Sequence, residues 1–209
     1  MKRILLYSIV MVLSLALLGG CKGPAEKYAK TIENLKAAFK GETTASAKYA
    51  AFAQKARQDS LPQIAVLFEA ASKAESIHAG NHKAVLEKYG AKPDEFTPEF
   101  EVKTTKENLQ AAIDGETYEF TTMYPDFLAV AEKEGSADAK KSFTWAMDTE
   151  KKHAEFYKQA LAALDANNVA SLSAEYFVCP KCRNTFQAAN VEEKCSFCMT
   201  PKDKFIDFK

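Results

Sequence analysis

The sequence predicts an all-α four-helix bundle followed by a small module that contains four cysteines. Two observations support this prediction. The chain repeats itself, because residues 33–43 (ENLKAAFKGET) and residues 107–117 (ENLQAAIDGET) are identical at eight of eleven positions. In addition, residues 175–209 hold two Cys-x-x-Cys pairs. The length of 209 residues leaves room for one medium and one small domain.

The first half of the repeat predicts a helical hairpin. Tyr28, Ile32, Leu35 and Phe39 recur at helical spacing within residues 24–57 and form one apolar stripe. Residues 59–62 (DSLP) end this helix and begin another, because Ser favours the cap position and Pro accepts the first turn. The second helix is expected over residues 61–89, before a glycine that ends it.

The second half predicts another hairpin, reached by a long connection. Residues 91–103 contain two prolines and no helical period, which indicates a crossover. Thr104 and Glu107 form a capping-box pattern for a third helix that ends near Gly135, and Ser136 is expected to cap a fourth helix that ends near Asp165. Short joints within pairs and one long joint between them are typical of a ferritin-like bundle. The alternative is a plain bundle whose Glu and His residues are solvated.

Each half also carries a Glu-x-x-His tetrad, at Glu75–His78 and at Glu150–His153. Residues three apart lie on one helix face, so each tetrad presents a carboxylate and an imidazole to the same point. Glu42 and Glu116 follow the glycine of each repeat and add one carboxylate from each of the other two helices. This is the ligand pattern of di-iron and di-manganese bundles, and four buried glutamates without metal would be very costly.

Two residues break the symmetry of the repeat. Glu119 lies three residues after Glu116, on the same face, whereas the first half has Ala45 at the equivalent place. The site should therefore hold one spare carboxylate. His82 has no histidine counterpart in the second half, and we expect it either behind the site or on the surface.

The C-terminal cysteines predict a second metal site. Two Cys-x-x-Cys knuckles can arrange four thiolates tetrahedrally around one metal, either iron or zinc. The expected ligands are Cys179, Cys182, Cys195 and Cys198. Six aromatic residues are expected to form a miniature core for so small a module: Tyr176, Phe177, Phe186, Phe197, Phe205 and Phe208.

The N-terminus predicts export. Lys2 and Arg3 precede an apolar run over residues 4–18, and the following Gly-Gly-Cys21 resembles a lipoprotein lipobox. We expect a signal peptide over residues 1–20, lipidation at Cys21 and a membrane-anchored lipoprotein in the periplasm or on the outer face of the envelope. An ordinary N-terminal membrane anchor is the alternative. The formal net charge of zero gives no indication of nucleic-acid binding.

These boundaries divide the chain into four expected parts. They are the signal peptide (1–20), the bundle (21–165), a polar linker (166–174) and the four-cysteine module (175–209).

With both metal patterns placed, residues 27–209 resemble the rubrerythrin family, which has a ferritin-like bundle and a rubredoxin-like module. The resemblance implies seven diiron ligands: Glu42, Glu75, His78, Glu116, Glu119, Glu150 and His153. It further implies that Glu75 and Glu150 bridge the irons, and that one iron moves between Glu119 and His78 with redox state. Tyr49 and Tyr124 match tyrosines beside the site.

The resemblance also has consequences for the module and for assembly. It implies one iron held by the four cysteines, and a homodimer or larger assembly in which one subunit's rubredoxin iron lies near its partner's diiron site. Arg183 and Met199 stand where rubredoxin knuckles usually have glycine or another small residue. The lipoprotein signal is a second departure, because the relatives we would compare are mostly cytoplasmic.

The expected function is reduction of hydrogen peroxide to water in oxidative-stress defence. Two irons can supply the two electrons that cleave the O–O bond, and Glu119 is the leading proton donor. The four-cysteine iron would return electrons from a periplasmic or membrane redox carrier. The alternatives are a ferroxidase or iron-handling protein, a non-enzymatic lipoprotein with a structural zinc ribbon, and a purely structural bundle.

Overall fold

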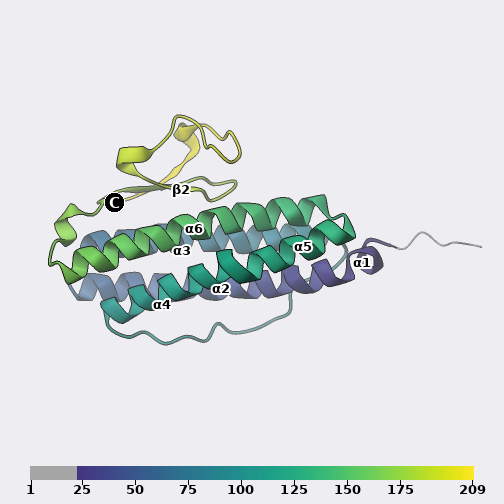
Figure 1. Ribbon diagram of the computed structural model, residues 1–209, viewed down its shortest axis with the longest axis horizontal. Coiled ribbons are helices and arrows are strands. Elements are labelled where there is room, and N and C mark those ends of the chain that lie inside the picture. The colour runs from purple at the N-terminus through teal and green to yellow at the C-terminus, as the bar shows by residue number, and fades with distance from the viewer. Residues whose placement is uncertain (1–22) are drawn as a thin grey trace, which may run out of the picture.

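The computed structural model describes residues 23–209, so the expected signal peptide and Cys21 lie outside the described residues. The described chain forms an elongated helical bundle with the four-cysteine module lying along one side (Figure 1). The predicted fold class is thereby confirmed. None of the helices in residues 23–209 is both long and apolar enough to cross a membrane.

The first hairpin forms as predicted, with small shifts at its ends. Helix α1 (Pro24–Lys27) is one turn, and after a break at Tyr28 the chain continues as α2 (Ala29–Gln58) and α3 (Pro62–Lys88). Ser60 does not cap α3, because its φ of 60° places it in the left-handed region and Leu61 takes the cap position.

The second hairpin contains α4 (Thr105–Tyr118), the π-helix η1 (Glu119–Met123), α5 (Tyr124–Glu134) and α6 (Ala137–Asp165). The predicted capping box is present, since the Thr104 hydroxyl accepts from the Glu107 amide and the Glu107 side chain accepts from the Thr104 amide. Ser136 does stand at the cap of α6. Its hydroxyl is bonded to the Tyr89 hydroxyl at 2.5 Å instead of capping the helix.

The π-helix explains a change of register in the repeat. Glu42 and Glu116 are 74 residues apart, whereas Tyr49 and Tyr124 are 75 apart. The second copy therefore has one extra residue between positions 116 and 124, where η1 lies. A π turn accommodates such a residue without ending the helix. Glu119 is the first residue of this turn.

A long crossover joins the hairpins. Residues 91–103 leave α3 and run along the outside of the bundle to the start of α4 (Figure 1). Phe96 in this segment packs edge-on against Phe39 of α2, with ring centroids 6.2 Å apart. The crossover that the prolines and the missing helical period predicted is therefore present, and it lies against the bundle.

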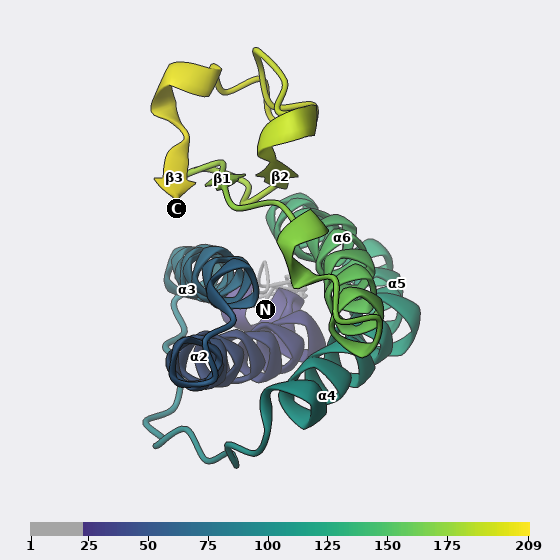
Figure 2. The ribbon, with the colours of Figure 1, turned by 90° about the vertical axis from the view of Figure 1, so that its left-hand side faces the viewer.

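The four-cysteine module contains a three-stranded antiparallel sheet in the order β2-β1-β3. Its strands are β1 (Tyr176–Val178), β2 (Thr185–Gln187) and β3 (Ile206–Phe208), with short 3-10 turns at Val169–Ser171 (η2), Ala188–Asn190 (η3) and Lys202–Lys204 (η4). Viewed along the bundle, the sheet covers α3 and α6 (Figure 2).

The module's aromatic residues do not form one independent core. Phe177, Phe186, Phe197 and Phe205 pack around the cysteines as expected. Tyr176 and Phe208 instead join the apolar core of the bundle. The linker is also less detached than its polarity suggested, because Val169 and Leu172 pack against the same core. Module and bundle thus share buried surface, which stabilises their relative position.

Candidate metal centres

Six of the predicted ligands meet in the middle of the bundle. Glu42 comes from α2, Glu75 and His78 from α3, Glu116 from α4, and Glu150 and His153 from α6. All six are at most 1% exposed. They lie between two apolar clusters, one around Phe52 and Phe68 and the other around Leu35 and Phe143. We call these six residues the carboxylate–histidine site.

The six residues form two overlapping groups of four. One contains Glu42, Glu75, His78 and Glu150; the other contains Glu75, Glu116, Glu150 and His153. Within each group the ligand atoms all lie within 4.8 Å of one another. Glu75 and Glu150 belong to both groups, so the arrangement offers two metal positions with two shared carboxylates.

The distances show an approximate twofold symmetry that follows the sequence repeat. His78 Nδ1 lies 2.8 Å from Glu75 Oε2, 3.0 Å from Glu150 Oε1 and 3.7 Å from Glu42 Oε2. His153 Nδ1 lies 2.9 Å from Glu75 Oε1, 3.3 Å from Glu150 Oε2 and 3.8 Å from Glu116 Oε1. Each shared carboxylate therefore turns one oxygen toward each histidine.

The donor atoms fit bound metal ions. Ligand atoms about 2 Å from one metal lie roughly 3 to 4 Å from each other, as these do. Several are buried and have no hydrogen-bond partner among the described residues: Glu42 Oε2, Glu75 Oε1, Glu116 Oε2, both Glu150 oxygens and His153 Nδ1. Orphaned buried acceptors are costly, and a dication satisfies them.

The pKa shifts indicate a shortage of positive charge. Burial raises the pKa of Glu75 to about 8, reinforced by the charge of Glu42, and burial with the charge of Glu75 raises the pKa of Glu116 to about 8. Burial and neighbouring carboxylates also raise the pKa of Glu150. Burial acts in the same direction on Glu42, but the charge and hydrogen bond of His78 outweigh it and lower its pKa. Bound cations would remove this conflict.

Two tyrosines, one from each half of the repeat, each donate a hydrogen bond to a carboxylate of the other half. The Tyr49 hydroxyl of the first half donates to Glu116 Oε1 of the second half at 2.7 Å. Conversely, the Tyr124 hydroxyl of the second half donates to Glu42 Oε1 of the first half. Both tyrosines are at most 2% exposed, and burial raises the pKa of each, so they remain neutral donors. Each fixes the orientation of one unshared carboxylate.

Glu119 is near the site but outside both groups of four. Its carboxylate is half-buried at the start of the π-helix and faces Gly41 of α2, where a Cβ on that glycine would lie 3.9 Å from Glu119 Oε1. Burial, followed by the charges of Glu42 and Glu116, raises its pKa. The six-residue site is thus complete without Glu119, which stands beside it as a spare carboxylate.

His82 is a buried residue behind the site, so the surface alternative is wrong. It is 0% exposed, its Nε2 lies 3.2 Å from the Tyr124 hydroxyl, and its Nδ1 lies 2.9 Å from the Ser142 hydroxyl. At the repeat offset of 75 its counterpart is Tyr157, which packs against Tyr49 with ring centroids 5.5 Å apart. Each of the two tyrosines therefore contacts one aromatic ring: Tyr124 contacts His82, and Tyr49 contacts Tyr157.

The four predicted cysteines gather in the module as free thiols within one group. The Sγ atoms of Cys182 and Cys195 are 3.2 Å apart, and those of Cys179 and Cys198 are 3.5 Å apart. A disulfide would need about 2.05 Å, whereas four thiolates at about 2.3 Å from one metal lie roughly 3.7 Å apart. The spacing therefore fits a tetrahedral metal site.

One contact that the sequence did not reveal joins the two centres. Thr185 of β2 places its Oγ1 2.9 Å from His153 Nε2 and donates to the Arg183 carbonyl at 3.0 Å. Because Nε2 is engaged, Nδ1 of His153 is the nitrogen that faces the carboxylates. Thr185 lies in no motif and outside the repeat, so no sequence signal could have identified it.

The fold and the two candidate metal sites together define the class of protein. A ferritin-like bundle with a paired carboxylate–histidine site and a rubredoxin-like four-cysteine module is a diiron protein with a second, mononuclear iron. The family model described as Rubrerythrin matches residues 33–161, more than half of the chain. The chain therefore belongs to the rubrerythrin family.

Its relatives span nearly the whole described chain. Nigerythrin of Nitratidesulfovibrio vulgaris is 39% identical over 186 residues, covering 85% of this chain and 86% of the relative. Rubrerythrin-2 of Clostridium acetobutylicum is 33% identical, covering 87% and 98%. The structure of fully reduced, all-ferrous nigerythrin superposes with a TM-score of 0.76 at 38% identity, covering 85% and 86%.

Family membership and geometry indicate the cofactors. The ligand groups match a carboxylate-bridged diiron pair and a four-cysteine site for one iron, with zinc as the alternative, and the chain is a diiron redox protein of the oxidative-stress type. A bacterioferritin of Rhodobacter capsulatus superposes with a TM-score of 0.62 at 22% identity, covering 68% of this chain and 91% of that one, which shows the shared bundle fold alone.

Proposed function

We propose that this protein is a peroxidase that reduces hydrogen peroxide to water in oxidative-stress defence. The observation that supports it most is the pairing of a buried two-metal site with the four-cysteine module across one hydrogen bond, between His153 Nε2 and Thr185 Oγ1. Such a pair matches a two-electron oxidant at one centre to a one-electron carrier at the other. When bound, the two irons supply the two electrons that cleave the O–O bond.

The residues of the site divide this work. Glu75 and Glu150 would bridge the two metals, because each offers one oxygen to either side. His78 and His153 would bind a metal through Nδ1, while Glu42 and Glu116 would each complete one side. The Tyr49 and Tyr124 hydroxyls hold those two carboxylates in place, so the site keeps its shape when peroxide enters.

Glu119 is the proposed proton carrier. It lies beside the site in a π turn, where the chain departs from α-helical geometry, and its carboxyl is half-buried. A carboxyl oxygen there can hold a proton and deliver it to the departing oxygen. We also propose that Glu119 and His78 exchange as ligands of one iron when the redox state changes.

The surroundings of the protein form part of the proposal. The N-terminal pattern supports export, cleavage after residue 20 and lipidation of Cys21 on a membrane surface. Nicotinamide cofactors are then not the direct donor, and a periplasmic or membrane redox carrier supplies the electrons. We further propose that the protein assembles as a homodimer or larger oligomer.

Stopped-flow mixing tests the proposal. Reduced, iron-loaded protein is mixed anaerobically with hydrogen peroxide, and separately with dissolved O2, while the absorption of both iron centres is followed. We expect rapid reoxidation by peroxide and much slower reoxidation by O2. Iron centres that stay reduced for seconds in peroxide would contradict the proposal, and faster reaction with O2 would favour ferroxidase activity.

A further inference from the structure

His82 and Ser142 are two buried polar residues that are not among the metal ligands. His82 is 0% exposed and Ser142 is 5% exposed. The centroid of the His82 ring lies 6.1 Å from that of Tyr124 and 5.4 Å from that of Phe143. Buried polar atoms need hydrogen-bond partners, and in these aromatic surroundings each nitrogen of His82 has one.

The hydrogen bonds of His82 run toward the metal site in one direction. Glu42 has a lowered pKa and is a carboxylate that can only accept, so the Tyr124 hydroxyl donates its single proton to Glu42 Oε1. The Tyr124 oxygen, 3.2 Å from His82 Nε2, must therefore accept a hydrogen bond from that nitrogen. In a neutral imidazole the other nitrogen is then an acceptor, so the Ser142 hydroxyl donates to His82 Nδ1 at 2.9 Å. We call Ser142, His82, Tyr124 and Glu42 the hydrogen-bonded chain.

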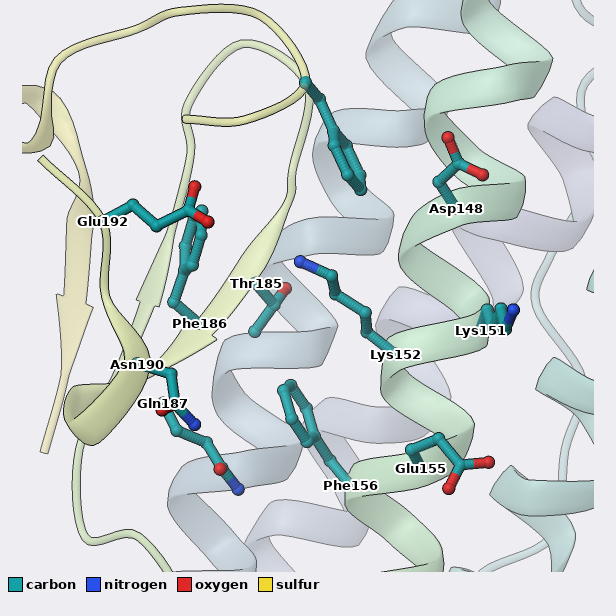
Figure 3. A pocket seen from close by; sticks show the side chains of 11 residues that line it. Asp148, Lys151, Lys152, Glu155, Phe156, Thr185, Phe186, Gln187, Asn190 and Glu192 are labelled. Carbon is teal, nitrogen blue, oxygen red and sulfur yellow. The ribbon is translucent and has the colours of Figure 1, made fainter. Parts of the chain in front are cut away.

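The hydrogen-bonded chain belongs to the helical bundle alone. Its four members come from α6, α3, α5 and α2 in that order. None of the four lines the pocket beside the four-cysteine module, where Lys152, Phe156 and Thr185 are among the lining residues (Figure 3). What the chain does is therefore independent of where the module lies.

The other half of the repeat has no such chain. At the repeat offset of 75, the counterpart of His82 is Tyr157 and that of Ser142 is Leu67. The Tyr157 hydroxyl is buried without a hydrogen-bond partner among the described residues, and its ring packs against Tyr49. Tyr49 therefore donates to its carboxylate with no donor from either position behind it.

The hydrogen-bonded chain leaves one oxygen of Glu42 for a metal. Oε1 accepts from Tyr124, whereas Oε2 has no hydrogen-bond partner among the described residues and lies 3.7 Å from His78 Nδ1. A hydroxyl whose oxygen accepts a hydrogen bond becomes a stronger donor. His82 therefore strengthens the bond that holds Oε1, and this bond fixes the direction in which Oε2 points.

We propose that His82 and Ser142 are positioning residues for the metal bound by Glu42 and His78. Ser142 fixes the tautomer of His82, His82 fixes the Tyr124 hydroxyl, and that hydroxyl turns Glu42 Oε2 toward the metal. The metal position in the other half of the repeat has no such support, so the two positions of this symmetric ligand set are not equivalent. The proposal concerns the metal site itself and holds whichever oxidant reacts there.

Nuclear magnetic resonance of zinc-loaded protein labelled with ¹⁵N-histidine tests the tautomer. Zinc is diamagnetic and accepts carboxylate and imidazole ligands, and the sequence has only three histidines. His82→Gln identifies the His82 signals by their loss. We expect a proton on Nε2 of His82 and none on Nδ1, and a shift of the Nδ1 signal in Ser142→Ala. An Nε2 without a proton would overturn the proposal, because Tyr124 could then not accept from it.

Mössbauer spectroscopy of diferrous, ⁵⁷Fe-loaded protein tests the two metal positions separately. His82→Leu removes the donor to Tyr124, whereas His82→Gln retains an amide donor of similar reach. Tyr157→Phe is the matched control, because it removes only a hydroxyl that has no partner. We expect His82→Leu to change the signal of one iron of the pair, His82→Gln to restore it, and Tyr157→Phe to change neither.

Chelator competition measures the size of the effect. One of the two diiron metals should bind about 10- to 100-fold more weakly in His82→Leu, as expected when a metal ligand loses its outer hydrogen bonding. Unaltered circular dichroism shows that the helices of the variant are folded. Equal weakening of both metals would indicate general destabilisation and overturn the proposal, as would affinities equal to those of Tyr157→Phe. If His82→Leu does not fold, Ser142→Ala replaces it: weakening of one metal supports the proposal, and unchanged affinity overturns it.

Discussion

Once its metal is removed, the protein should become less stable as the pH rises from about 5 to about 7. Ordinary salt-bridged carboxylates give the opposite trend. Glu75 and Glu116 both have a folded-state pKa of about 8, compared with 4.5 for an unperturbed glutamate. A carboxyl whose pKa is raised by folding stabilises the fold below 4.5, and this contribution is lost as the pH rises through 8.

The expected size follows from proton counts. Over that pH range the folded protein keeps a proton on each carboxyl that the unfolded chain has released, which costs about 1.4 kcal/mol per pH unit and group. Both groups are only 1% exposed, so solvent provides little screening. Glu75 and Glu116 over about two pH units contribute roughly 5 kcal/mol, or a fall in Tm of about 10 °C or more. The raised pKa values of Glu119 and Glu150 act in the same direction, and the lowered pKa of His153 acts against it. Glu42, whose pKa is lowered, is ionised throughout and contributes no slope.

Thermal unfolding followed by circular dichroism, after dialysis against chelator, measures this slope. Iron-loaded protein is the first control, because metal ligands bind deprotonated and loading should remove the loss. The double variant Glu75→Gln and Glu116→Gln is the second, since neutral amides cannot ionise and the metal-free slope should become shallower, with Glu119 and Glu150 left to titrate. A metal-free protein whose Tm is constant or rises from about pH 5 to about pH 7 would refute this reasoning.

Three other substitutions have distinct expected outcomes. Tyr49→Phe leaves Glu116 Oε1 without its buried donor and should cost about 1–3 kcal/mol in chemical unfolding, and a cost under about 0.5 kcal/mol would contradict this. Thr185→Val removes the Nε2 partner of His153 and should weaken iron binding about 10- to 100-fold in chelator competition. Affinity equal to that of the unaltered chain would show that Thr185 does not orient the ligand. Glu119→Ala should keep both diiron metals while slowing peroxide reduction about a hundredfold, whereas loss of iron would make it an indispensable ligand.

The sequence was sufficient for the bundle and for its six central ligands, for a physical reason. Matched Glu-x-x-His tetrads in the two halves of a helical repeat lie at the same level along the bundle. Glu42 and Glu116 lie at that level too, because they also occupy matched positions of the repeat. The capping box at Thr104 and Glu107 involves only residues three apart in the sequence, and it is present in the structure. Patterns within one element can therefore be predicted from sequence.

Contacts between distant elements could not be predicted in this way. The Thr185 contact with His153 and the Arg183 contact with Ile77 join segments far apart in the chain, and neither has a periodic signal. The π turn was visible only as a shift from 74 to 75 in the repeat offset. Ser60 and Ser136 failed as caps because a left-handed backbone and a bond to Tyr89 took precedence.

Our main proposal is that the paired sites of this chain reduce peroxide with electrons stored at both iron centres. Anaerobic titration of fully reduced, iron-loaded protein with hydrogen peroxide tests it most directly. We predict that both centres reoxidise, with one peroxide consumed for every two electrons held, and that water is the product. Peroxide left unconsumed while both centres remain reduced would contradict it.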